Sequence, residues 1–152
     1  MEPQVEIRHG EDPDALALVA AMEDEVVSRY GPVRSERTSL LEASELSPPT
    51  GAFVVLTLGG RAVAGGGVRR LEPGVGELKR MYVLPEARGR GLGRRLLAAL
   101  EAAAADLGLE RLRLDTDEQL TAALALYRSA GYEPIPDYNG NAYASFWGEK
   151  RL

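Results

Sequence analysis

The chain has 152 residues, 45% of them hydrophobic, and a formal net charge of −5. This length is typical of one domain with a sizeable core, so we expect a single domain over residues 1–152. The sequence contains no long uncharged apolar run and no basic-then-apolar leader, and we therefore expect no membrane span and a cytoplasmic protein. The absence of cysteine excludes disulfides, a thiolate nucleophile and most zinc sites.

The charge is unevenly distributed along the chain. Residues 1–46 contain eleven acidic and four basic residues, whereas residues 77–95 contain six basic and two acidic residues. A short basic segment in an acidic protein favours a compact anionic ligand, because long nucleic acids need a wider basic surface. RNA binding through this segment is the alternative, and we expect no nucleic-acid partner.

The first third of the sequence predicts one strand and two helices. Alternating residues at 5–10 indicate the strand. A long helix follows, with Asp12 as its N-cap, Pro13 at its first position and Gly31 as its stop. A second, short helix is expected near residues 36–46, where a Ser-Pro-Pro-Thr-Gly sequence ends it.

Three consecutive strands are predicted over residues 52–58, 61–71 and 77–83. A Gly-Gly dipeptide separates the first two, and a Pro-Gly-Val-Gly turn separates the second from the third. Such short connections predict an antiparallel meander. The three glycines at 65–67 weaken the middle strand or mark a bulge in it.

The second half of the sequence alternates helices and strands. A helix is predicted over residues 91–107, a strand over 110–116, a short helix within 118–132 and two final strands within 132–152. The strands on either side of the first of these helices should be parallel, with a right-handed crossover. The sequence therefore predicts an α/β domain with a single mixed sheet of about seven strands and about four helices.

The sequence RGRGLGRR at residues 88–95 links a predicted strand to a predicted helix. This layout binds phosphate on backbone N–H groups, and a bound anion would offset the positive charges at the helix start. Neither the G-x-G-x-x-G dinucleotide spacing nor the P-loop spacing fits the segment. The pattern that remains is Arg88-x-x-Gly91-x-Gly93.

This pattern resembles the Arg/Gln-x-x-Gly-x-Gly/Ala signature of the GNAT superfamily of N-acetyltransferases. The blocks ELKRMYVLPEARGRGLGRRLLAALE, ALALYRSAGYEPI and FWGEKRL are similar to successive blocks of that family, most closely over residues 76–134. The resemblance implies a GNAT-like acyl-CoA N-acyltransferase fold. It also implies direct transfer of an acetyl group from acetyl-CoA to a primary amine in a ternary complex, without an acyl-cysteine.

The same resemblance implies where the cofactor binds. In the family, the glycine-rich turn binds the pyrophosphate of acetyl-CoA. Backbone groups at a bulge in the preceding strand face the thioester oxygen and the pantetheine arm. The residues implied are Met81, Tyr82, Val83, Arg88, Gly89, Arg90, Gly91, Leu92, Gly93 and Arg94.

Two catalytic residues are implied as well. Glu77 lies where some family members place a glutamate general base, and its alternative role is a strand-end glutamate paired with Lys79 or an arginine. Tyr127 matches the family tyrosine that hydrogen-bonds the sulfur and protonates the departing thiolate, and its alternative role is a core tyrosine. Leu120 stands where many members have an asparagine that contacts the cofactor, so we assign no such contact here.

The acceptor is the least defined part of the prediction. In the family it enters opposite the cofactor, between the first two helices and the loop that joins the last two strands. Here those segments contain Glu23, Glu25, Glu36 and the sequence DYNGNAY at 137–143. These carboxylates suit a small-molecule or peptide amine, or they form a solvated helix face. A non-catalytic module that binds acetyl-CoA as a sensor or partner is the alternative function, and a homodimer is an open possibility because dimers are common in the family.

Overall fold

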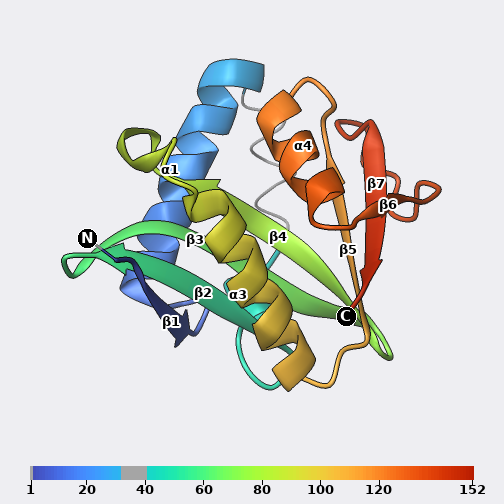
Figure 1. Cartoon of the computed structure of the whole chain (residues 1–152), viewed down its shortest axis with the longest axis horizontal. Helices are drawn as coiled ribbons and strands as arrows, with labels where there is room; N and C mark the ends of the chain where they lie inside the picture. The colour runs from blue at the N-terminus through green and yellow to red at the C-terminus, as the bar shows by residue number, and fades with distance from the viewer. Residues whose placement is uncertain (1, 32–40) are drawn as a thin grey trace.

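The computed structural model describes residues 2–31 and 41–152. One seven-stranded sheet crosses the molecule in the order β1-β2-β3-β4-β5-β7-β6, and every neighbouring pair is antiparallel except β4–β5 (Figure 1). The predicted meander and parallel crossover are confirmed. The strands are β1 (Gln4–Arg8), β2 (Gly51–Leu58), β3 (Arg61–Glu72), β4 (Val75–Val83), β5 (Arg111–Thr116), β6 (Glu133–Pro134) and β7 (Phe146–Arg151).

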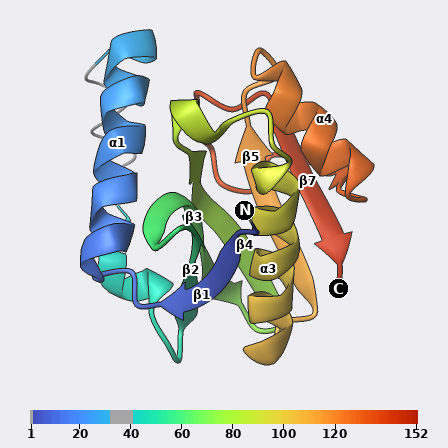
Figure 2. The ribbon, with the colours of Figure 1, turned by 60° about the vertical axis from the view of Figure 1, so that its left-hand side comes forward.

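Helices cover both faces of the sheet. Helices α3 and α4 lie on one face and α1 lies on the other (Figure 2). Of the short helix predicted near 36–46, residues 36–40 lie outside the described residues, and Ala43–Leu46 form a 3₁₀ helix. The described α-helices are α1 (Pro13–Tyr30), α3 (Leu92–Asp106) and α4 (Thr121–Ser129), and Pro85–Ala87 form a second 3₁₀ helix.

Strand β2 shows how the sheet divides the core in two. Phe53 and Val55 point toward α1, and the alternating neighbours Val54 and Leu56 point toward α3; all four are fully buried. The larger core lies under α3, whose apolar stripe is Leu92, Leu96, Leu97, Leu100, Ala103 and Ala104. Because both faces of the sheet are buried, its central strand, β4, is held in a fixed position.

Strands β4 and β5 pair over only three residues and then separate. Val75–Glu77 pair with Arg111–Arg113, but β4 continues to Val83 without β5 beside it. In this stretch β4 also contains a bulge, with one more residue than β3 between the pairs Gly65–Tyr82 and Gly67–Lys79. The extra residue lies in β4, where the family resemblance implied a bulge, and not in β3, where the three glycines were expected to mark one. The separation opens a gap in the sheet where the candidate site lies.

Candidate active site

The glycine-rich loop turns the chain from β4 into α3. Gly89 and Gly91 have φ of 81° and 76°, a left-handed conformation that costs free energy for any residue with a Cβ. Gly91 is the N-cap of α3, and it has no side chain to occupy the first-turn N–H groups. An added Cβ at either glycine would meet no described atom within 4 Å. The start of α3 therefore presents backbone donors to open space, as an anion site requires.

A pocket of about 540 Å³ opens between this loop, the end of β4 and α4, and we name it the loop pocket. Glu25 and Arg29 of α1 also reach its wall. The structure brings most of the predicted site together here: the residues that line the pocket include Met81, Tyr82, Val83, Arg88, Gly89, Gly91, Leu92, Gly93 and Tyr127.

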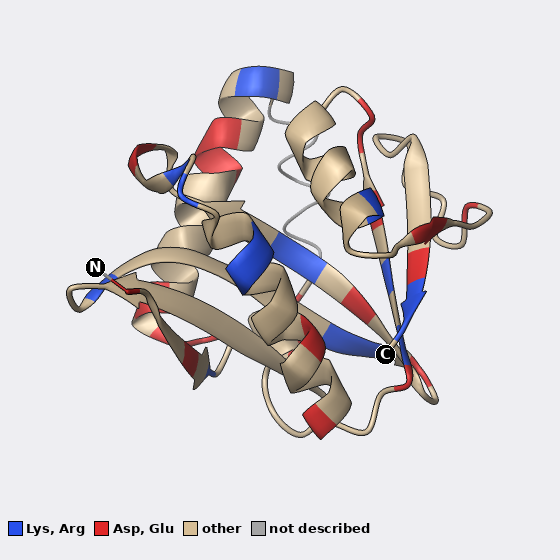
Figure 3. Cartoon of the chain, in the orientation of Figure 1, with Lys and Arg blue, Asp and Glu red and all other residues tan. Residues whose placement is uncertain are grey.

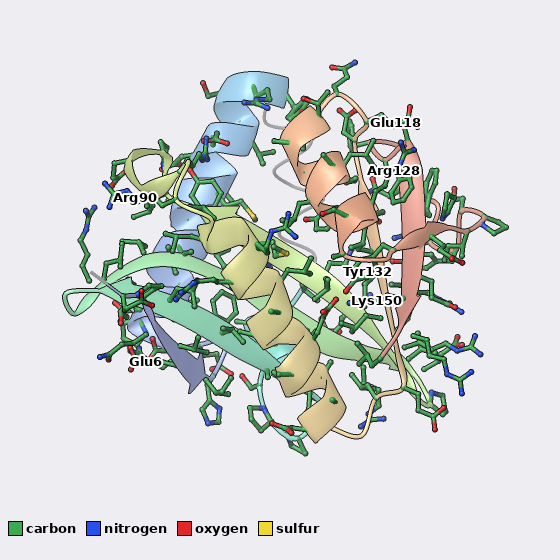
Figure 4. The ribbon with its side chains drawn as sticks, viewed as in Figure 1. Glu6, Arg90, Glu118, Arg128, Tyr132 and Lys150 are labelled. Carbon is green, nitrogen blue, oxygen red and sulfur yellow. The ribbon has the colours of Figure 1, made fainter. Side chains whose placement is uncertain are left out.

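Two of the predicted cofactor residues lie outside the loop pocket. Arg90 lies on the side of the loop away from α4, in a hollow that Glu2 and Pro3 also line (Figure 4). Arg94 Nη2 donates to Ser129 Oγ at 3.4 Å on the surface. Successive residues at a helix start project in different directions, so a basic run in the sequence does not form one basic wall. The basic loop lies beside the acidic stretch of α1 (Figure 3).

Arg88 fastens the loop to β4 and α1. Its Nε donates to the Val83 carbonyl at 3.0 Å, and its Nη2 pairs with Glu25 at 2.9 Å. The Tyr82 hydroxyl donates to the same Glu25 carboxylate at 3.1 Å, and burial together with that carboxylate raises the pKa of Tyr82. Glu25, expected on the acceptor side, therefore belongs to the loop pocket, while Glu36 lies outside the described residues.

A second pocket, of about 240 Å³, lies in the gap between β4 and β5, and we name it the strand-gap pocket. Lys79 and Arg80 line it from β4, Asp115 from the end of β5, and Asn141 from the loop that joins β6 to β7. Leu120, the departure from the family asparagine, gives it an apolar wall. Four residues line both pockets: Met81, Leu120, Ala123 and Tyr127.

Tyr127 of α4 separates the two pockets. Its hydroxyl lies 3.7 Å from the Met81 sulfur, and its ring contacts Tyr132 edge to face at 6.1 Å between centroids. Burial, and to a lesser extent the charge of Asp115, raises the pKa of Tyr127 to about 12. The hydroxyl is therefore neutral at physiological pH and is available as a proton donor.

Sequence reasoning missed the two carboxylates at the end of β5. Asp115 and Asp117 both line the strand-gap pocket. Asp115 lies 3.9 Å from Lys79 Nζ and accepts a close hydrogen bond from Asn139 Nδ2. A usable signal was present: the sequence LDTD ends a strand predicted to be parallel to the one before the loop, and the carboxyl ends of parallel strands meet at one edge.

Glu77 lines neither pocket. Its side chain is 1% exposed, and it accepts hydrogen bonds from Arg69 Nε at 3.0 Å and from the Tyr138 hydroxyl at 2.7 Å. Lys79 Nζ lies 3.5 Å from it, and Asn139 Nδ2 donates to it at 3.4 Å. The predicted alternative of a glutamate paired with Lys79 and an arginine matches these contacts.

The comparisons with known proteins agree with this geometry. The model of the acetyltransferase (GNAT) family matches residues 12–132, so the chain belongs to that family. An IAA acetyltransferase from Azospirillum brasilense is 39% identical over 99 residues, which are 64% of this chain. The chain spans 65% of that relative's length.

Solved structures share the whole fold. A proposed acyl-CoA N-acyltransferase from Klebsiella pneumoniae is 32% identical, with a TM-score of 0.78, over 99% of this chain and 97% of its own. The proposed acetyltransferase yncA of Salmonella typhimurium, solved with acetyl-CoA, is 17% identical with a TM-score of 0.68, over 98% of this chain and 94% of its own. Among the residues described for our chain, no helix combines the length and apolarity that a membrane span needs.

Proposed function

We propose that this protein is an acetyl-CoA-dependent N-acetyltransferase that acts by direct transfer to a primary amine. The observation that carries the proposal is the position of Tyr127, a neutral, partly buried hydroxyl at the junction of two pockets. One pocket ends at an anion-binding helix start, and the other contains two carboxylates. A donor with a phosphate group and a cationic acceptor would thus meet at a proton donor.

The residues of the loop pocket fit acetyl-CoA. The N-terminal N–H groups of α3, left open by glycine, would hold the pyrophosphate. The unpaired edge of β4 that lines the loop pocket, at Met81–Val83, would receive the pantetheine arm as an added strand. Acetyl-CoA would supply the acetyl group as an activated thioester. The fit supports acetyl-CoA as the donor, the cofactor with which the Salmonella protein was solved.

The strand-gap pocket supports a small cationic amine as acceptor. The lining contains two cations, Lys79 and Arg80, beside the carboxylates Asp115 and Asp117. The two carboxylates would bind an ammonium group, which carries its charge at neutral pH because alkylamines have a pKa of ~10.4. A volume of about 240 Å³ suits a small molecule or the terminal residue of a peptide. We propose Asp115 as the group that receives the amine proton, directly or through water, since it lines the same pocket as Tyr127, whereas Glu77 lines neither pocket.

The proposed step balances with these residues. The amine nitrogen forms a bond to the acetyl carbon as the carbon–sulfur bond breaks. The bound ammonium would give one proton to Asp115 before the attack. The second nitrogen proton would pass to the Tyr127 oxygen as the proton of Tyr127 goes to the departing sulfur, whose conjugate thiol has a pKa of ~8.5. No cysteine is present to carry the acetyl group, which is consistent with direct transfer.

The test is a screen of primary amines with acetyl-CoA, in which free thiol is measured, together with calorimetry of acetyl-CoA binding. Binding with turnover on at least one small amine is the expected result. Failure to bind acetyl-CoA would overturn the proposal. Binding without turnover on every amine would instead support the non-catalytic acetyl-CoA-binding module.

A further inference from the structure

A row of alternating charges crosses four neighbouring strands on the sheet face opposite α3. Arg69 of β3 pairs in register with Glu77 of β4, Glu77 with Arg113 of β5, and Arg113 with Glu149 of β7. Arg69 Nε lies 3.0 Å from Glu77, and Arg113 Nε lies 2.8 Å from Glu149. The row thus places one buried carboxylate, Glu77, between two guanidinium groups on adjacent strands.

Tyr138, from the loop between β6 and β7, lies on this row. Its hydroxyl donates to Glu77 Oε2 at 2.7 Å, and its ring faces the Arg113 guanidinium at 5.4 Å. Burial and the Glu77 carboxylate raise the pKa of Tyr138, which keeps the hydroxyl a donor. The next residue, Asn139, also donates to Glu77. Two successive loop residues are therefore held by a single carboxylate.

The same loop forms one side of the strand-gap pocket. Asn141 and Ala144 line that pocket, and Asn139 contacts Asp115 through its Nδ2. Trp147 Nε1 donates to Asn139 Oδ1 at 3.0 Å. The contacts that hold Tyr138 and Asn139 in place therefore also fix one wall of the strand-gap pocket and the position of the Asp115 partner Asn139.

We propose that Glu77 is a positioning residue: it fastens residues 137–143 over the charge row through Tyr138 and so shapes the acceptor side of the strand-gap pocket. The inference rests on the proposed function only in taking that pocket as the acceptor site. A general base must reach the proton that it removes, directly or through one water. Glu77 is 1% exposed, has both oxygens hydrogen-bonded, and lines neither pocket.

The test compares Glu77→Ala, Glu77→Gln and Tyr138→Phe, with Glu133→Gln as the control. Glu133 is exposed and stands at the β6 end of the same row, opposite Glu149. Glu77→Ala and Tyr138→Phe should raise the KM for the amine about tenfold, because each removes the hydrogen bond between Tyr138 and the charged Glu77. Their dissociation constants for acetyl-CoA should stay unchanged. Glu77→Gln should have a smaller effect and keep the pH profile, since its amide oxygen still accepts from Tyr138.

A general base would give the opposite pattern. Glu77→Gln would then be as inactive as Glu77→Ala, would lose a limb of the pH profile, and would leave the KM unchanged, while Tyr138→Phe would behave as wild type. That result would overturn the proposal. Tyr138→Phe removes only one hydroxyl, so it keeps the test decisive if Glu77→Ala fails to fold.

A second measurement does not depend on enzymatic activity. Trp147 is the only tryptophan in the sequence and is hydrogen-bonded to the fastened loop. Tyr138→Phe should shift Trp147 fluorescence to longer wavelength and increase its quenching by acrylamide, whereas Glu133→Gln should not. If no amine is acetylated but this shift occurs, the proposed function fails and the fastening stands. If fluorescence and quenching are unchanged in Tyr138→Phe, the fastening itself is overturned.

Discussion

The loop pocket and the strand-gap pocket are built in different ways. Half of the residues that line the loop pocket come from the continuous stretch 81–93, and much of its proposed binding uses backbone groups of β4 and α3. The strand-gap pocket gathers side chains from α1, β4, β5, α4 and the loop between β6 and β7. A site that binds largely through backbone groups can keep its donor while the other pocket changes its acceptor by substitution of side chains.

The largest effect expected on binding concerns the loop pocket. Gly91→Glu should lower the affinity for acetyl-CoA at least ~100-fold, because it strains a position with φ of 76° and adds a negative charge where the pyrophosphate would lie. The matched control is Gly108→Glu, which has φ of 81° and open space around it at the other end of α3. Calorimetry should show normal binding for the control, and equal losses in both variants would contradict a phosphate site at Gly91.

The next prediction concerns the junction between the pockets. Tyr127→Phe should lower kcat ~10²- to 10⁴-fold by removing the proton donor, with little change in the dissociation constant for acetyl-CoA. Tyr132→Phe is the control, because its hydroxyl bonds Glu101 and lines neither pocket. Wild-type turnover in Tyr127→Phe would exclude the donor role.

The pKa of Tyr127 also predicts the pH dependence. With a folded-state value of about 12, above its ordinary 10.0, the hydroxyl stays protonated up to high pH. The contribution of this group to stability is complete below about pH 10 and is lost as the pH rises through 12. Turnover should therefore show no alkaline loss from this group below pH 10 when kcat is measured at saturating amine. A loss of kcat below pH 10 that disappears in Tyr127→Phe would contradict the raised pKa of Tyr127.

The strand-gap pocket gives a prediction of intermediate size. Asp115→Asn keeps the shape of the side chain but removes its charge, so kcat/KM for the amine should fall ~10- to 100-fold. Affinity for acetyl-CoA should not change, since Asp115 does not line the loop pocket. Asp106→Asn, at the exposed end of α3, serves as the control in the same thiol-release assay. If the affinity for acetyl-CoA fell instead, the assignment of acetyl-CoA and the amine to separate pockets would be wrong.

The smallest expected effect concerns Arg88, which links the glycine-rich loop to β4 and α1. Arg88→Ala removes the bonds to Val83 and Glu25, both at a partly exposed side chain. We expect a loss of about 0.5–1 kcal/mol in the free energy of unfolding and a several-fold weaker binding of acetyl-CoA. Chemical denaturation and calorimetry would measure the two effects. Arg61→Ala, which removes the exposed pair with Glu86, should cost similar stability and leave binding unchanged.

The sequence by itself determined the loop pocket and most of the fold. The order of strands and helices, the caps of α1 and the signature Arg88-x-x-Gly91-x-Gly93 are local features, because short-range turn, capping and periodicity rules decide them. Tyr127 was singled out for the same reason, from its place in a contiguous block, and the structure places it at the wall of the loop pocket. The predictions of strand order and helix caps succeeded because those features are made from neighbouring residues.

Only the tertiary structure decided the roles that depend on distant residues. The register across four strands places Glu77 between Arg69 and Arg113, and the β6–β7 loop then covers it with Tyr138. The separation of β4 from β5 brings Asp115 beside the junction instead. Charge and residue type indicate what a carboxylate can do, but burial, register and neighbours decide whether it meets a substrate or holds a loop.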